Sequence, residues 1–258
     1  MRIDTFLFEK GIYPSRTKAS EAVKKGLVLY KNKPIKTSLD VSSLDDITIL
    51  QTKHNFVSNG GYKLQKAIDD FNFDPMGLVF ADIGASNGGF TDCLLKHNAK
   101  KIYAIDVGES QLDTSLLNEK VVVLDNTNAR FLDKEILGEL VDGVVCDVSF
   151  ISLKLIIPSI NKILKDNGVA LLLIKPQFEC GKEYLGNSGI VKSKQVRHTV
   201  CENIYNYAVQ NDLYPVNITT APIRPKKNVE YIIKLTKKES ELIDITKFKQ
   251  KLQLLNEV

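Results

Sequence analysis

The stretch ADIGASNGGFTDCLL, residues 81–95, constrains the fold more strongly than any other part of this 258-residue chain. A short apolar strand leads into a glycine-rich turn, and the turn leads into the start of a helix. A strand, a glycine turn and a helix in this order are typical of α/β folds, which bind ligands beyond the carboxyl ends of their strands. The stretch therefore predicts a ligand site at the turn.

From residue 61 onward, strand patterns and helix patterns alternate along the chain. The strands are short, rich in β-branched residues and apolar on both sides, which indicates a parallel sheet covered on both faces. We therefore expect a Rossmann-like, doubly wound α/β domain with a mostly parallel sheet. Its expected strands span 78–84, 101–108, 121–126, 141–150, 169–176 and 228–235, and its expected helices span 62–71, 89–98, 155–168 and 194–212.

The first 60 residues differ from the rest in charge. They hold 10 Lys and Arg against 6 Asp and Glu, whereas the remaining residues hold 25 of each. Residues 10–36 contain eight basic residues and a single acid, Glu21. A small segment that carries the whole net charge of a chain is typical of a module that binds a polyanion such as nucleic acid.

The same segment has the pattern of a small α+β domain. One helix is expected to end at Gly11, a second is expected to run from the cap Ser15 to Gly26, and two short strands around a turn follow. We therefore divide the chain into an N-terminal domain (1–50), a linker (51–59), the α/β domain (60–236) and an extension (237–258). The extension repeats apolar residues at helical spacing, so it either covers an edge of the sheet or meets a partner.

The glycine turn resembles the G-x-G-x-x-G dinucleotide fingerprint, but Ser86 replaces its second glycine. Such a turn is a poor cradle for pyrophosphate and suits an adenosine cofactor without phosphates, for which S-adenosylmethionine is the candidate. Asp106 ends the next strand, where a carboxylate can accept the ribose hydroxyls. As an alternative, the glycines only allow a tight turn. The candidate cofactor-binding residues are Asp82, Gly84, Ser86, Gly88, Asp106, Asp125 and Asn126.

Charged residues lie at or beside three further apolar strands. Asp147 and Lys175 end two of them, and Glu230 lies within NVEYIIKL. One such residue is compatible with a salt bridge at the edge of the sheet. Charges at several strand ends indicate a site in the ligand crevice.

The motifs SNGGYKLQKAI, GASNGGFTDCLL, CDVSFISL, LIKPQFECGK and NVEYII resemble those of the TlyA-type methyltransferases, relatives of the FtsJ-like ribose 2′-O-methyltransferases. The N-terminal segment resembles the S-four RNA-binding domain that precedes the catalytic domain in that family. The likeness extends from about residue 2 to residue 235. Asn59, Asn87 and the absence of a glycine beside Glu230 depart from the family pattern. The resemblance implies a catalytic tetrad of Lys63, Asp147, Lys175 and Glu230.

In this tetrad we expect Lys175 to be the general base, because a ribose hydroxyl must lose its proton during methyl transfer. A second ammonium at Lys63 would lower the proton affinity of Lys175 by like-charge repulsion. Asp147 and Glu230 would orient the lysines and the nucleophile, and we expect no metal. The candidate RNA-binding residues are Arg2, Arg16, Lys18, Lys24, Lys25, Lys31 and Lys33.

The resemblance implies 2′-O-methylation of ribosomal RNA, at cytidine, within ribosomal subunits or ribosomes. Two alternatives are a haemolysin-like protein and a non-catalytic ribosome-binding protein. We expect no membrane association, because no apolar run approaches the roughly 20 residues that a membrane helix needs. Four scattered cysteines, without a CxxC pair, are typical of free thiols in the cytoplasm. We expect a monomer or a weak dimer.

Overall fold

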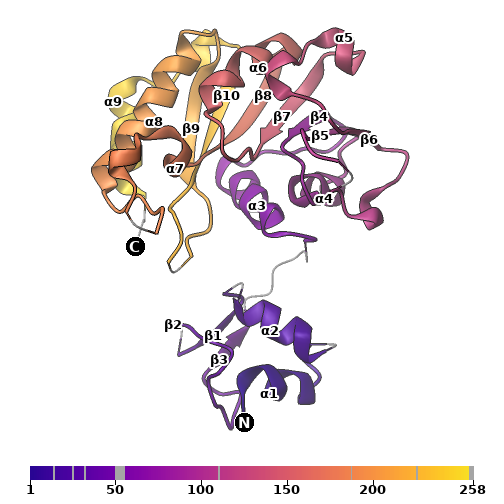
Figure 1. Ribbon diagram of the computed structural model, residues 1–258, viewed down its shortest axis with the longest axis vertical. Coiled ribbons are helices and arrows are strands. Elements are labelled where there is room, and N and C mark those ends of the chain that lie inside the picture. The colour runs from indigo at the N-terminus through magenta and orange to yellow at the C-terminus, as the bar shows by residue number, and fades with distance from the viewer. Residues whose placement is uncertain are drawn as a thin grey trace. The chain divides into compact units, whose positions relative to one another are not determined.

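The computed structural model of this protein describes residues 1–13, 15–24, 26–31, 33–49, 56–109, 111–186, 188–224 and 226–255. The chain forms two compact units, Met1–Asn55 and Phe56–Val258 (Figure 1). The expected linker is too long at its carboxyl end. Phe56 is only 5% exposed and belongs to the core of the second unit, because it packs beside the helix that begins at Asn59.

The first unit contains two helices and a small antiparallel sheet of order β2-β1-β3. Ser15 caps the second helix as expected, its Oγ accepting a hydrogen bond from the Lys18 amide at 3.2 Å. Residues 28–30 and 33–34 pair as two antiparallel strands, and Lys31, between them, has a φ of 50°. The elements are α1 (Ile3–Glu9), α2 (Arg16–Lys24), β1 (Val28–Tyr30), β2 (Lys33–Pro34) and β3 (Ile47–Ile49).

The second unit is built on a seven-stranded sheet of order β6-β5-β4-β7-β8-β10-β9. The neighbouring strands β6, β5, β4, β7 and β8 are parallel to one another, and β10 is antiparallel to both of its neighbours, β8 and β9. This confirms the mostly parallel sheet. The strands are β4 (Val79–Ile83), β5 (Lys101–Ile105), β6 (Val121–Leu124), β7 (Val141–Cys146), β8 (Leu164–Ile174), β9 (Tyr214–Thr220) and β10 (Tyr231–Thr236).

Strand β9 was not predicted, and β8 begins earlier than predicted. Edge strand β9 was missed because Pro215 and Asn217 interrupt its apolar alternation; an edge is where a strand tolerates proline. Residues 164–168, expected at the end of a helix, open β8. The fully buried Leu164 pairs with Val141 there.

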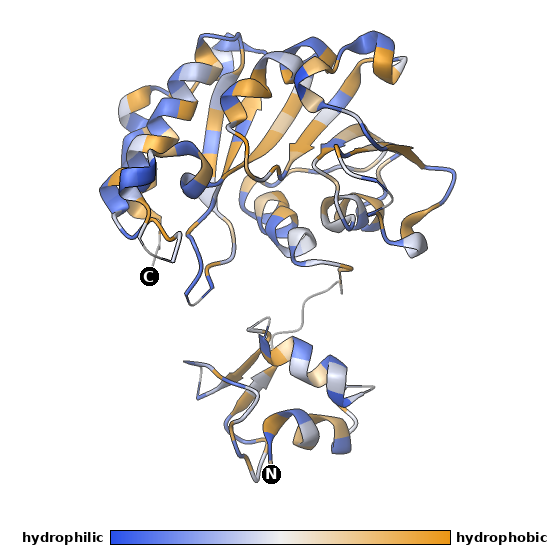
Figure 2. Cartoon of the chain, in the orientation of Figure 1, coloured by the Kyte–Doolittle hydropathy of each residue, from blue (hydrophilic) through white to orange (hydrophobic). Residues whose placement is uncertain are grey.

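Helices cover both faces of this sheet (Figure 1). Helices α3 and α4 pack on one face around Phe80, and α6 and α8 pack on the other around Ile83. Figure 2 shows the hydrophobic strands enclosed between helices with hydrophilic outer faces. The helices are α3 (Asn59–Phe71), α4 (Gly89–Lys96), α5 (Lys134–Leu137), α6 (Ile157–Ile163), α7 (Pro176–Glu179), α8 (Lys194–Val209) and α9 (Ile245–Leu254), with 3-10 turns at Thr114–Leu116, Ala129–Phe131, Leu153–Leu155, Lys182–Tyr184 and Glu239–Glu241.

The C-terminal extension contains the expected amphipathic helix, α9, and the fold decides between its two possible roles. Phe248 and Leu252 are fully buried, and the Phe248 ring lies 4.8 Å from the Tyr205 ring of α8. Helix α9 also contacts edge strand β9. The extension therefore covers the edge of the sheet within its own unit.

Candidate active site

The glycine turn between β4 and α4 follows a left-handed path. The φ angles are 80° at Gly84, 46° at Ser86 and 85° at Gly88. The Asp106 carboxylate holds the turn, because its Oδ2 accepts a hydrogen bond from the Ser86 amide at 2.8 Å and its Oδ1 accepts one from the Gly108 amide at 2.9 Å. Asp106 thus fastens the end of β5 to the turn after β4.

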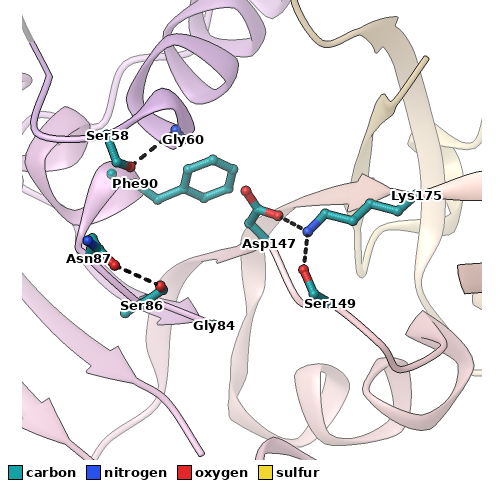
Figure 3. A pocket seen from close by; sticks show the side chains of 11 residues that line it. Ser58, Gly60, Gly84, Ser86, Asn87, Phe90, Asp147, Ser149 and Lys175 are labelled. Atoms are coloured by element: carbon teal, nitrogen blue, oxygen red, sulfur yellow. Dashed lines mark hydrogen bonds and ion pairs between the residues drawn. The ribbon is translucent and has the colours of Figure 1, made fainter. Parts of the chain in front are cut away.

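A pocket opens beside this turn (Figure 3). The turn forms one wall and the first residues of α3 form another. The two walls approach closely because residue 89 is glycine: a Cβ atom there would lie 2.2 Å from the Ser58 Oγ. The lining residues are Ser58, Gly60, Gly84, Ala85, Ser86, Asn87, Gly89, Phe90, Asp147, Ser149 and Lys175.

Two lysines and two carboxylates meet next to the pocket and form a continuous chain of ion pairs. Lys175 Nζ lies 2.6 Å from Asp147 Oδ1, and Lys63 Nζ lies 3.2 Å from Asp147 Oδ2 and 2.8 Å from Glu230 Oε2. The residues come from α3, the ends of β7 and β8, and the residue before β10. The four residues predicted from separate parts of the sequence therefore lie in contact with one another.

The two lysines and two carboxylates of this site carry opposite charges in equal number, and all four side chains are largely buried. Their exposed fractions are between 9% and 18%. Burial by itself lowers the pKa of Lys63, but the charges and hydrogen bonds of Asp147 and Glu230 outweigh it and raise that pKa overall. Lys63 therefore stays an ammonium ion, and it partly neutralises both carboxylates.

Three further side chains of this site were not predicted. Ser149 Oγ lies 2.7 Å from Lys175 Nζ, and Gln177 Nε2 donates a hydrogen bond to Glu230 Oε1 at 3.3 Å. Phe150 is 90% exposed, has a φ of 63°, and its ring centroid lies 4.9 Å from that of Phe178. The motifs DVSF and KPQF already carried these residues, but only the fold shows what they contact.

The loop that carries Asp147, Ser149 and Phe150 is fastened at its far end by Glu179. The Glu179 carboxylate accepts hydrogen bonds from the Ser152 hydroxyl at 2.6 Å and the Leu153 amide at 2.7 Å. Burial raises the pKa of Glu179. A carboxylate in α7 thus fixes the loop between β7 and α6 relative to Lys175.

The candidate cofactor residues lie in different positions relative to the pocket. Gly84 and Ser86 line it, whereas Asp82 is fully buried behind it and accepts a hydrogen bond from the Thr91 hydroxyl at 2.6 Å. Asp82 Oδ1 has no hydrogen-bond partner among the described residues, and burial raises the pKa of Asp82 to about 7. Asp82 therefore supports α4 and does not contribute to the pocket wall.

The other four candidates lie outside the pocket lining. Gly88 is the N-cap of α4 and lies against Leu112 and Leu116; a Cβ atom there would lie 2.3 Å from a Leu116 methyl group. Asp106 and the neighbouring pair Asp125 and Asn126 follow β5 and β6. The Asn126 amide donates a hydrogen bond to the Gly108 carbonyl, which joins the ends of these two strands.

The candidate RNA-binding residues of the first unit fall into two groups, and Lys25 lies outside the described residues. Arg2 and Arg16 are half-exposed and pair with the buried Asp4, whose pKa is lowered although burial alone would raise it, because both arginines favour the carboxylate. Lys18 pairs with Glu21, and Lys31 pairs with Asp46. Lys24 and Lys33 are exposed.

A mostly parallel sheet with a pocket beyond the carboxyl ends of its strands is the framework on which doubly wound α/β proteins bind ligands. Residues 56–237 match the FtsJ-like methyltransferases, and residues 1–47 match the S4 domain. The chain therefore belongs to the FtsJ-like methyltransferase family and carries an S4 domain at its N-terminus.

Similar proteins share almost the whole chain. Hemolysin A of Brachyspira hyodysenteriae is 37% identical, with 90% of this chain and 98% of that protein covered. The 16S/23S rRNA (cytidine-2'-O)-methyltransferase TlyA of Mycobacterium tuberculosis is 37% identical, with coverages of 90% and 88%. A solved structure from Streptococcus thermophilus that bears a hemolysin label is 34% identical, with a TM-score of 0.74 and coverages of 98% and 94%.

More distant structures share the fold alone. An S-adenosylmethionine dependent methyltransferase from Mesorhizobium loti is 10% identical, with a TM-score of 0.51 and coverages of 69% of this chain and 99% of that chain. Among the residues that the structure describes, no helix is both long enough and apolar enough to span a membrane.

Proposed function

We propose that this protein transfers the methyl group of S-adenosylmethionine to a ribose 2′-hydroxyl of ribosomal RNA, at cytidine as in its relatives named TlyA. The observation that carries the proposal is the chain of ion pairs from Lys175 through Asp147 to Lys63 and Glu230. It lies beside a glycine turn at the carboxyl end of a parallel strand, where α/β folds bind their ligands.

The residues of the pocket suit an adenosine cofactor without phosphates. Lys175 is the only cation among the described residues that line the pocket, and the Asp147 carboxylate binds that cation. Gly84 and Ser86 would hold the cofactor against the turn. Each carboxylate oxygen of Asp106 already accepts one backbone hydrogen bond and would accept a second one from a ribose hydroxyl. When bound, S-adenosylmethionine supplies a methyl group that its sulfonium already activates.

The protein must therefore position the hydroxyl and accept its proton. Lys175 is the proposed base, and Ser149 already places a hydroxyl oxygen within hydrogen-bond distance of its Nζ. Lys63 neutralises part of the Asp147 charge, so Asp147 stabilises an ammonium at Lys175 less than it would alone. Asp147 and Glu230 orient the two lysines.

The Phe150 ring centroid lies 4.9 Å from that of Phe178, and Lys175 Nζ lies 5.8 Å from the centroid of the Phe178 ring. A large aromatic side chain that is almost fully exposed, on a strained left-handed backbone, indicates a functional constraint. Bases of single-stranded RNA stack on such rings. Phe150 is therefore the proposed platform for the target base or its neighbour.

The test is transfer of a radiolabelled methyl group from S-adenosylmethionine to ribosomal subunits, intact ribosomes and free ribosomal RNA. The wild type is compared with Lys175→Ala and with Lys66→Ala, a control lysine on α3 that pairs with Asp70 outside the tetrad. We expect ribose label from the wild type and the control, and none from Lys175→Ala, with cofactor binding retained in all three. Cofactor binding without label on any ribosomal substrate would overturn the proposed substrate and favour a non-catalytic ribosome-binding protein.

The proposal extends to the setting of the reaction. The S4 domain favours an RNA partner, and we propose RNA within ribosomal subunits or ribosomes of the cytoplasm as the substrate. We further propose that the protein acts as a monomer or a weak dimer. The three substrate forms in the methyl-transfer assay test the first point, and sedimentation at two protein concentrations tests the second.

A further inference from the structure

Two loops of the second unit are joined into one surface beside Glu230. The first comprises the described residues of 186–194 and ends with the first residue of α8, and the second comprises the described residues of 222–228, between β9 and β10 (Figure 1). Asn228 joins them: its Oδ1 accepts a hydrogen bond from the Val191 amide at 2.8 Å, and its Nδ2 donates one to the Gly189 carbonyl at 3.0 Å. We refer to the described residues 186, 188–194, 222–224 and 226–228 as the basic loop pair.

The buried Arg197 of α8 holds the first loop in place through hydrogen bonds to its backbone. Arg197 is only 7% exposed, and its Nη1 donates hydrogen bonds to the carbonyls of Val191 at 3.1 Å and Lys192 at 2.8 Å. Its Nε donates a further bond to the Tyr231 hydroxyl at 3.2 Å, and Tyr231 follows Glu230 directly. The loop pair is therefore anchored to the strand that follows the tetrad residue Glu230.

The basic loop pair carries a concentrated positive charge. It contains five basic residues and no Asp or Glu, although the chain beyond residue 60 has equal numbers of acids and bases. None of the five side chains forms an ion pair with another described residue, and four of them are exposed while Arg224 is half-buried. These residues are Lys192, Lys194, Arg224, Lys226 and Lys227.

The carboxylates of the neighbouring tetrad do not compensate this charge. Glu230 lies three residues beyond Lys227, but its carboxylate binds Lys63 and Gln177, and Asp147 binds both tetrad lysines. The uncompensated cations therefore attract an anionic partner to the edge of the site where a ribose would react.

We propose that the basic loop pair binds the phosphate backbone of the RNA strand next to the target nucleotide, an inference that rests on the proposed function. A strand that places its 2′-hydroxyl at Lys175 carries a phosphate on either side of that ribose. Fixed cations beside Glu230 hold one flank of this strand. The catalytic unit thus has its own contact with RNA, separate from the S4 domain.

The test compares full-length wild type with the triple variant Arg224→Gln/Lys226→Gln/Lys227→Gln. A charge-matched control carries Lys134→Gln/Lys162→Gln/Lys247→Gln, on α5, α6 and α9, away from the loop pair. Binding to purified ribosomal RNA and to poly-glutamate is measured across a salt series, together with S-adenosylmethionine binding and the melting temperature. Methyl transfer to ribosomal subunits is measured in parallel.

We expect the loop variant to bind RNA about tenfold more weakly than wild type. The slope of log affinity against log salt concentration should fall by the equivalent of about two phosphate contacts. The control should bind RNA like wild type, and all three proteins should bind cofactor equally. Unchanged RNA affinity and salt dependence in the loop variant would overturn the inference. The inference would also be overturned if wild type bound poly-glutamate as tightly as RNA and the loop variant lost both kinds of binding to the same extent. Loss of RNA binding by the loop variant, with no methyl transfer even by the wild type, would support the loop contact and overturn the proposed function.

Discussion

A Cβ atom at Gly84 would lie 2.9 Å from the backbone carbonyl oxygen of Asp147. Gly84 opens the glycine turn, and the backbone of Asp147, which binds both lysines of the tetrad, leaves no room for a side chain there. On the other side, the Asp147 amide donates a hydrogen bond to the Ile83 carbonyl at 3.0 Å. The ends of β4 and β7 thus set the positions of the glycine turn and the tetrad relative to each other.

The first prediction follows from this contact. Gly84→Ala would strain a φ of 80° and push its methyl group into the Asp147 backbone, whereas Gly77→Ala has a similar φ of 74° with no atom within 4 Å of the added Cβ. The left-handed conformation costs each variant roughly 1–2 kcal/mol. Calorimetric titration with S-adenosylmethionine should show at least about tenfold weaker binding for Gly84→Ala alone. Equal affinities in the two variants would show that the contact does not matter.

The second prediction concerns Lys63. In Lys63→Met, Asp147 and Glu230 lose the ammonium group that binds both of them, so neither carboxylate is held in place beside Lys175. The rate of methyl transfer should therefore fall at least about tenfold, with cofactor binding retained. Lys66→Met, on the same helix, should keep the wild-type rate. A wild-type rate in Lys63→Met would exclude this positioning role.

The third prediction concerns the buried Asp82. Its pKa is raised from 3.8 to about 7, so between these pH values the folded protein holds a proton that the unfolded chain has lost. The contribution of Asp82 to stability is therefore present below about pH 4 and is lost as pH rises toward 7. Asparagine has no proton to lose, so the free energy of unfolding of Asp82→Asn does not fall for this reason as pH rises. The difference in this free energy between Asp82→Asn and wild type should therefore change by up to about 4 kcal/mol in favour of the variant between pH 4 and pH 8.

Urea unfolding of both proteins across this pH range measures the effect of Asp82. Asp166→Asn, at a fully exposed carboxylate, is the control and should follow wild type. A constant difference in the free energy of unfolding between Asp82→Asn and wild type would mean that Asp82 ionises as readily in the folded protein as in the unfolded chain.

The fourth prediction concerns Phe150. Removing its ring in Phe150→Ala should weaken RNA binding about tenfold, because a base stacked on an aromatic ring contributes about 1–3 kcal/mol. Fluorescence titration with labelled RNA gives the affinity, and cofactor binding should not change. Phe150→Tyr should restore binding, whereas Phe150→Leu, which is apolar but has no aromatic face, should not. Full binding by Phe150→Leu would rule out stacking.

Local sequence patterns were sufficient where one element determines the structure by itself. The strand, turn and helix around Gly84 were predicted because glycine alone adopts the left-handed conformation without strain. Helix α3 was predicted because Leu64, Ala67, Ile68 and Phe71 share one face, and all four are buried. Strand β9 was missed because its pairing with β10, and not its own pattern, makes it a strand.

The sequence by itself determined the two-unit organisation and the class of fold, and through family resemblance it predicted four residues as a catalytic tetrad. Only the tertiary structure decided their contacts. Lys63 in α3 and Glu230, the residue before β10, lie far apart in the chain and meet only in the folded protein. It also decided that Asp82 is buried, that α9 covers the edge of the sheet, and that Asn228 joins two basic loops. These features depend on long-range packing, which brings residues together without leaving a periodic signal in the sequence.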